Sequence, residues 1–191
     1  MGTAMVSVIL NIVLAALAFM AVWMHSRKNP WHMVLRFFTA QSNIFCAVSA
    51  VLVAVFRIAG DVPQWVLIVK YVGTAAVTVT LLTVFFFLAP FVTGLKYLLS
   101  GPDLWLHLVC PVLALVSYVG WDHPPAPFAV VFLGMLPVLL YGLLYLYKIL
   151  QAPEEKRWDD YYTFNRNGKW PISFGAMMLA SFGISVILWV I

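Results

Sequence analysis

The stretch that decides the fold runs from Phe37 to Ile58 and reads FFTAQSNIFCAVSAVLVAVFRI. Beyond its first two turns it is apolar almost throughout, and it has the length of about 20 residues with which a helix crosses a hydrocarbon core of about 30 Å. Its first turns hold Thr39, Ser42 and Asn43. A bilayer offers these groups no water, so they either bond to the protein or line a wet or reactive pocket.

The whole chain has the composition of an integral membrane protein. Of its 191 residues 64% are hydrophobic and 9% are charged, whereas about a quarter of the residues in a soluble domain are charged. We therefore predict an all-α, polytopic membrane protein, with six transmembrane helices in one bundle and a single domain over residues 1–191. The predicted spans cover residues 3–24, 37–58, 64–91, 104–120, 126–150 and 171–191.

The basic residues are divided unequally between the two sides of these spans. Nine lie in or beside the first, third and fifth connections, whereas the opposite side holds only Arg57. The positive-inside rule therefore predicts a multi-pass cell-membrane protein with both termini outside the cytoplasm. The first span is expected to be retained, since basic residues follow it and none precedes it. Lys70, near the outer end of the third span, is expected to extend to the surface. The nine are Arg27, Lys28, Arg36, Lys96, Lys148, Lys156, Arg157, Arg166 and Lys169.

Charge and histidine content limit the classes of partner and cofactor. The net charge of +4 comes from the basic connections, and it fits anionic lipid headgroups better than nucleic acid. A six-helix haem protein needs paired histidines in facing helices, and only His107 lies near such a position. Cys46 and Cys110 stand in no metal-binding motif. We predict a membrane setting without nucleic acid, metal or cofactor, and the sequence carries no signal for an oligomeric state.

A second polar position opens the fourth span. The run from Ser100 to Asp103 resembles a helix start with Ser100 as cap, and His107 follows one turn after Asp103. The second and fourth spans both run outward, so Thr39 and His107 are expected at equal depth, about one turn below the cytoplasmic surface. A hydroxyl and a neutral imidazole so placed are the minimum for a nucleophile with its base. Alternatively, Thr39 bonds the carbonyl four residues back and His107 is structural.

Neighbouring polar residues are candidates for supporting roles. Asn43 shares a helix face with Thr39 and either donates to an oxyanion or forms an interhelical hydrogen bond. Arg36 either holds a substrate carboxylate or anchors the helix to phosphate. Ser42 is grouped with Arg36 as a substrate-binding candidate, and Asp103 is predicted to cap its helix.

The segment before the sixth span, residues 158–170, reads WDDYYTFNRNGKW. Its aromatic and charged residues are typical of an interfacial belt. Because it shares the cytoplasmic side with Thr39 and His107, the alternative is a lid over the pocket mouth.

Three motifs carry a family resemblance: FFTAQSN at residues 37–43, HLVCP at residues 107–111, and the aromatic segment before the sixth span. Together with six spans they resemble a bacterial family of six-transmembrane proteins. That family is in turn similar to the androgen-induced and androgen-dependent membrane hydrolases of animals, threonine hydrolases that cleave fatty acid esters of hydroxy fatty acids. The resemblance implies a lipid ester as substrate, Thr39 as nucleophile and His107 as base.

One position departs from the family pattern. Relatives tend to have asparagine four residues before the histidine, where this chain has Asp103. Asp103 either orients the imidazole of His107, as an acid partner would, or marks a changed chemistry. The rival hypothesis is a bundle that binds or transports a lipid or small molecule without catalysis.

Overall fold

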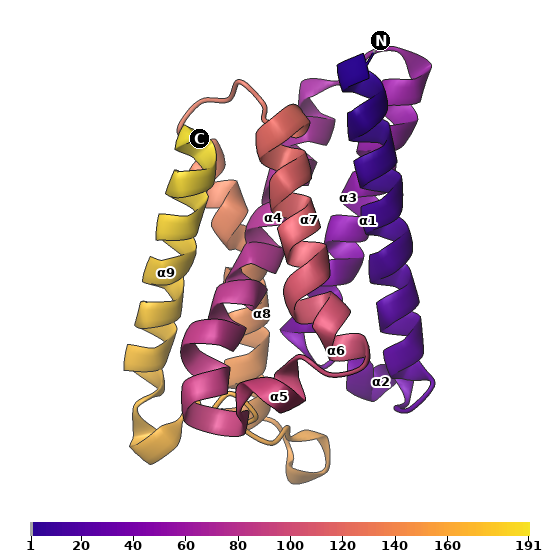
Figure 1. Ribbon diagram of the computed structural model, residues 1–191. Coiled ribbons are helices and arrows are strands. Elements are labelled where there is room, and N and C mark those ends of the chain that lie inside the picture. The colour runs from indigo at the N-terminus through magenta and orange to yellow at the C-terminus, as the bar shows by residue number, and fades with distance from the viewer. Residues whose placement is uncertain (1) are drawn as a thin grey trace.

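The computed structural model describes residues 2–191, and this part of the chain is helical with no strand (Figure 1). Six helical segments are long and apolar enough to cross a membrane, which confirms the predicted all-α bundle. They are α1 (Gly2–Ser26), α3 (Phe38–Ala59), α4 continued by η1 (Gln64–Thr93), the run of α6, η2, α7 and η3 (Pro102–Asp122), α8 (Val130–Leu150) and α9 (Trp170–Val190).

Short helices lie in the connections. They are α2 (Trp31–Val34), α5 (Leu95–Leu98), η4 (Glu154–Lys156) and η5 (Arg166–Gly168). The third span ends in a π-helix, η1 (Val84–Thr93), which contains Pro90. Proline has no amide hydrogen to donate within a helix, and wide π turns accommodate the missing bond. Gly94, with φ of 83°, then ends the span.

Helix α4 is the centre of the bundle, because it packs against α3 and α7 on one side and against α8 and α9 on the other (Figure 1). Small residues such as Ala47, Ala50 and Ala114 fill the contact between α1, α3, α4 and α7, which lets these helices approach closely. Larger side chains such as Tyr71 and Ile184 fill the contact of α4 with α8 and α9.

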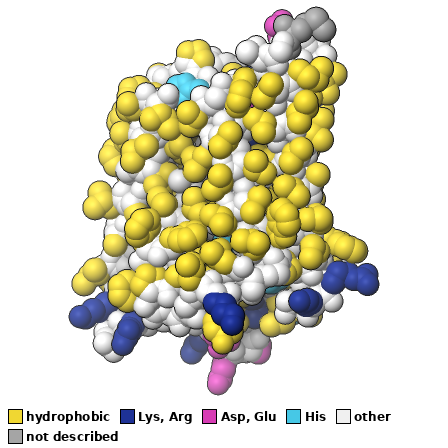
Figure 2. Space-filling model, viewed as in Figure 1, with side chains coloured by type: hydrophobic (Ala, Val, Ile, Leu, Met, Phe, Trp, Pro, Cys, Tyr) yellow, Lys and Arg dark blue, Asp and Glu magenta, His cyan; other side chains and the backbone are white. Residues whose placement is uncertain are grey.

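Charge is distributed along the bundle as the sequence predicts. Lys and Arg side chains gather at the end away from both termini, and the middle of the molecule is hydrophobic (Figures 1 and 2). Arg57 lies at the end that holds the termini, where its guanidinium bonds the Trp121 carbonyl at 3.2 Å.

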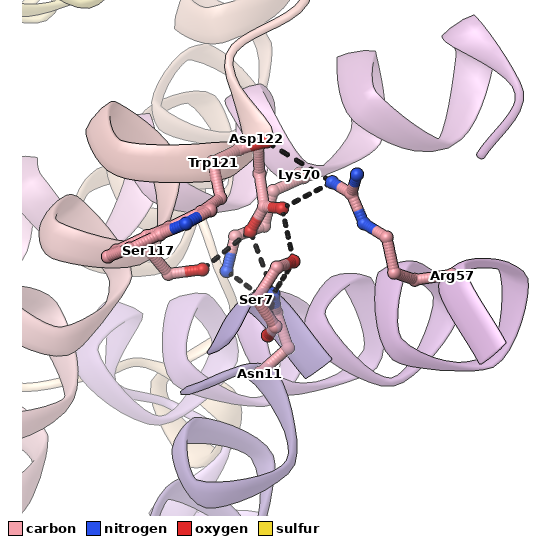
Figure 3. Close-up of polar contacts among 7 residues, drawn as sticks. All are labelled: Ser7, Asn11, Arg57, Lys70, Ser117, Trp121 and Asp122. Carbon is pink, nitrogen blue, oxygen red and sulfur yellow. Dashed lines mark hydrogen bonds and ion pairs between the residues drawn. The ribbon is translucent and has the colours of Figure 1, made fainter. Parts of the chain in front are cut away.

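The expectation that Lys70 extends to the surface is wrong. Its side chain is 0% exposed, and its amine donates to Oδ1 of Asn11 at 2.8 Å. Nδ2 of Asn11 donates in turn to Oδ2 of Asp122 at 2.7 Å (Figure 3). The Asn11 amide therefore links a buried amine to a buried carboxylate. Such bonds replace the water that the hydrocarbon core lacks.

Asp122 connects this chain of bonds to the remaining helices. Its carboxylate also accepts hydrogen bonds from Ser7 of α1 at 2.7 Å and from Ser117 of α7. Arg57 of α3 pairs with it at 3.0 Å (Figure 3). One carboxylate thus fastens α1, α3 and the fourth span together at the end that holds the termini, with Lys70 of α4 joined through Asn11.

Candidate active site

The bundle brings Thr39 and His107 together from positions 68 residues apart in the sequence. Thr39 lies in the first turn of α3, and His107 lies in the π turn η2 (Trp105–Val109). Oγ1 of Thr39 is 3.4 Å from Nε2 of His107. A hydroxyl and an imidazole at this separation have the arrangement of a nucleophile and a general base before substrate binds, when such contacts are often long.

The Thr39 hydroxyl is free to face the imidazole because of where α3 begins. A threonine within a helix usually bonds the carbonyl four residues back, as Thr78 does with Thr74 at 2.7 Å. For Thr39 that carbonyl belongs to Leu35, which lies before α3 and accepts from Nε2 of Gln41 at 2.7 Å. The helix start therefore leaves the hydroxyl of Thr39 without a backbone partner.

The backbone sets the tautomer of His107. Nδ1 lies 2.6 Å from the carbonyl oxygen of Leu98. A carbonyl only accepts hydrogen bonds, so Nδ1 carries the hydrogen of the neutral ring. Nε2 then presents its lone pair to Thr39, and the residue is buried, with 8% of its surface exposed. The imidazole is thereby oriented to accept the proton of the Thr39 hydroxyl.

The residue that orients His107 is not Asp103. Oδ1 of Asp103 pairs with Nδ1 of His25 on α1 at 3.5 Å, so the interpretation of Asp103 as the acid partner of the imidazole is wrong. Ser100 does not act as a side-chain cap either, since its hydroxyl donates to the Tyr97 carbonyl at 3.0 Å and α6 has no side-chain cap. The Leu98 carbonyl takes the orienting position, and no side-chain motif marks it in the sequence.

Asn43 forms the interhelical bond that was one of its two predicted roles. Nδ2 donates to the Thr39 carbonyl at 2.8 Å and to the Leu106 carbonyl at 3.0 Å. Both amide hydrogens are therefore engaged, and Asn43 has none to offer an oxyanion. The bonds hold the Thr39 carbonyl against the residue before His107, so Asn43 fixes the distance between the two helices.

Ser42 and Arg36 also hold segments together. Oγ of Ser42 is buried, 3.0 Å from Oγ1 of Thr80 on α4. The Arg36 guanidinium lies 5.9 Å from the ring centroid of Trp158, and the Arg36 carbonyl accepts from the Tyr141 hydroxyl at 2.7 Å. Neither residue lines the cavity beside Thr39.

That cavity has a volume of about 690 Å³. Its walls come from the first turn of α3, from α4 with η1, from α8 and α9, and from Tyr162 and Phe164 of the connection before α9. Thr39 and Thr80 are among its few polar residues. Pockets of this size and apolar character bind small organic ligands, and Thr39 is part of the wall of this one.

The first turn of α3 also supplies hydrogen-bond donors. The amides of Thr39 and Ala40 form no hydrogen bond to another group of residues 2–191. Free amides at a helix start attract negative charge. They stand next to the Thr39 hydroxyl, so a negative charge that developed there would meet free donors. Over the same residues, no group of three or more His, Cys, Asp and Glu side chains is placed to hold a metal ion.

Comparisons with known proteins add no assignment: no family model, curated protein or solved structure matches the chain. The family resemblance of the three motifs stays a prediction, and the case for a function depends on the geometry of the site.

Proposed function

We propose that this protein is an integral membrane hydrolase of lipid esters, of the fatty acid ester of hydroxy fatty acid type, with Thr39 as nucleophile and His107 as base. One observation carries the proposal. The Leu98 carbonyl fixes the hydrogen of His107 on Nδ1, so Nε2 faces the hydroxyl of Thr39 at 3.4 Å, and that hydroxyl has no backbone partner. A base oriented by an acceptor behind it is the arrangement that activates a hydroxyl nucleophile.

The reaction is an acyl transfer in two halves. Oγ1 of Thr39 attacks the ester carbonyl carbon while Nε2 of His107 takes the hydroxyl proton, and the carbonyl oxygen becomes an oxyanion. Collapse of this intermediate breaks the bond to the alcohol, which leaves with the proton from His107. Water then attacks the acyl-threonine with His107 again as base, and the acid departs as Oγ1 regains its proton.

The cavity supports a lipid as the substrate. Its wall is mostly apolar, and it opens beside Thr39 within the membrane-spanning part of the bundle. An acyl chain in this cavity would leave its ester carbonyl at the start of α3. The basic residues gather at the same end of the bundle (Figure 2), where a charged end of the lipid would meet them.

The orientation of the site in the membrane is part of the proposal. By the positive-inside rule, the end rich in Lys and Arg is cytoplasmic and both termini are outside. Thr39 and His107 then face the cytoplasmic leaflet of the cell membrane, whereas the cluster around Asp122 lies near the outer leaflet.

A non-enzymatic lipid carrier or binder is the second candidate function. The apolar cavity itself favours it, because such a cavity would hold a lipid whether or not a reaction follows. The two candidates differ in one property: the hydrolase has a threonine that forms a covalent bond, and the binder does not.

The test is covalent labelling of the purified protein in lipid nanodiscs with a long-chain fluorophosphonate. We expect labelling of the wild type, none of Thr39→Ala, and slow labelling of His107→Ala. Thr83→Ala is the matched control, because Thr83 lines the same cavity and forms no bond to His107. Equal labelling of Thr39→Ala and the wild type would reject the hydrolase. Absence of labelling, together with saturable binding of the lipid, would favour the binder.

A further inference from the structure

The proposed reaction needs hydrogen-bond donors for the oxyanion, and the side chain that the sequence suggests for this role is engaged elsewhere. Both amide hydrogens of Asn43 bond backbone carbonyls. The free amides of Thr39 and Ala40 are available. A side-chain donor that adds to these amides would come from the other residues that share the cavity with Thr39.

Three tyrosines line that cavity, and they differ in what their hydroxyls do. Tyr141 donates to the Arg36 carbonyl at 2.7 Å, and Tyr145 donates to Oδ1 of Asp160 at 3.0 Å. The hydroxyl oxygen of Tyr162 accepts from the Phe38 amide at 3.3 Å. The Tyr141 hydroxyl lies near that of Tyr162, but its own hydrogen is given to the Arg36 carbonyl. Within residues 2–191 no carbonyl or carboxylate accepts the hydrogen of the Tyr162 hydroxyl, so Tyr162 is the tyrosine of this cavity with a donor to offer.

The contact with the Phe38 amide brings this donor to the first turn of α3, next to the residue that precedes Thr39. Phe38 is the first residue of α3 and directly precedes Thr39, and Tyr162 and Thr39 line one cavity. Burial raises the pKa of the Tyr162 hydroxyl above its usual value. Since that value is about 10, the hydroxyl keeps its hydrogen at neutral pH.

The connection before α9 holds Tyr162 in place from several sides. Its amide donates to the Tyr145 hydroxyl at 3.2 Å, and the two ring centroids are 5.2 Å apart. The carboxylate of Asp160 accepts from the amides of Phe164 and Asn165, both at 2.8 Å. A donor fixed before the reaction stabilises developing charge without reorganising.

We propose that Tyr162 is a catalytic residue of the hydrolase proposed above, and that its hydroxyl donates a hydrogen bond to the oxyanion formed when Thr39 attacks the ester. The hydrogen stays on the phenol, while the proton of Thr39 passes to His107. This inference depends on the proposed function, and it gives the cytoplasmic segment a chemical role beyond that of an interfacial belt.

The experiment compares Tyr162→Phe with the matched control Tyr161→Phe, which changes the neighbouring residue of the same segment, outside the cavity wall, and removes a hydroxyl that is already engaged with Asp159. We expect Tyr162→Phe to lower kcat by about 100-fold, the effect of losing one oxyanion donor, with KM within about twofold. Tyr161→Phe should lower kcat less than about threefold. Thermal unfolding of both variants shows whether the fold is kept.

A second readout is independent of the effect of the Phe variant on folding. Fluorotyrosine at position 162 has a lower phenol pKa, so the alkaline limb of the rate against pH should move to lower pH, whereas fluorotyrosine at position 161, outside the cavity wall, should not move it. An unchanged limb, or equal kcat for Tyr162→Phe and wild type, would overturn the role of Tyr162. If Thr39→Ala also stays active, the hydrolase mechanism itself fails; if only Tyr162→Phe stays active, the failure is confined to this inference.

Discussion

Replacing Asp122 with Asn should destabilise the bundle, because one carboxylate holds several helices. It accepts hydrogen bonds from four side chains, those of Ser7, Asn11, Arg57 and Ser117. The asparagine amide has an NH2 group in place of one carboxylate oxygen, and this group cannot accept a hydrogen bond from the donors that face it. The substitution also removes the negative charge of Asp122. Hydrogen bonds between membrane helices contribute about 0.6 kcal/mol each on average, and removing one partner of a buried ion pair costs about 3–5 kcal/mol.

The ion-pair term must be reduced, since the Arg57 side chain is 23% exposed and can turn toward water or headgroups. We therefore expect Asp122→Asn to lower the free energy of unfolding by about 2–4 kcal/mol. The measurement is unfolding by sodium dodecyl sulfate in mixed micelles, followed by tryptophan fluorescence.

Lys70→Met is the matched control for this prediction. The Lys70 amine forms one hydrogen bond, to Asn11, and methionine of similar length removes a buried ionisable group. We expect a change of less than about 1 kcal/mol. A loss below about 0.5 kcal/mol for Asp122→Asn, or an equal loss for both variants, would refute the view that Asp122 is the centre of the network.

Three further predictions concern the cavity, the imidazole and the orientation. Gly183 lines the cavity and has open space at its Cβ position, so Gly183→Phe should shift the preferred ester toward shorter acyl chains. Gly175→Phe on the same helix should not, because Gly175 has equal space but lies outside the cavity wall. Equal chain-length profiles for the two variants would contradict the acyl site. Asp103→Asn should change kcat less than about threefold, because Asp103 pairs with His25 and not with His107; a loss of 100-fold would restore Asp103 as the orienting group. A periplasmic-type reporter fused after Ile191 should be active only outside the cytoplasm, and activity of a cytoplasmic reporter there would reverse the proposed orientation.

The sequence predicts the architecture well because the membrane imposes it. Apolar runs of spanning length must be helices in a bilayer, and the observed span from Phe38 to Ala59 departs by one residue at each end from the predicted 37–58. The same logic places Thr39 and His107 at one depth. Which helices are neighbours, and how far a residue is from its partner, comes from packing between distant segments.

Side-chain roles are harder to predict, since the decisive partners are backbone groups or residues far along the chain. Leu98 orients His107 through its carbonyl, which any residue at that position would provide. Lys70 has the sequence position of a surface lysine, yet Asn11, 59 residues earlier, accepts its hydrogen bond in the interior. Tyr162 stands in a segment typical of an interface, and only the fold shows that its hydroxyl reaches the start of α3.

The proposed hydrolase depends on a covalent acyl bond to Thr39 during turnover, which mass spectrometry after rapid quenching detects. The protein in nanodiscs is mixed with a long-chain activated fatty ester, stopped in acid within the first turnover, digested and mapped. We expect a fatty acyl group on the peptide that contains Thr39, with none on that peptide in Thr39→Ala. An acyl group on a different residue, or release of fatty acid in the first turnover without any acylated peptide, would contradict it.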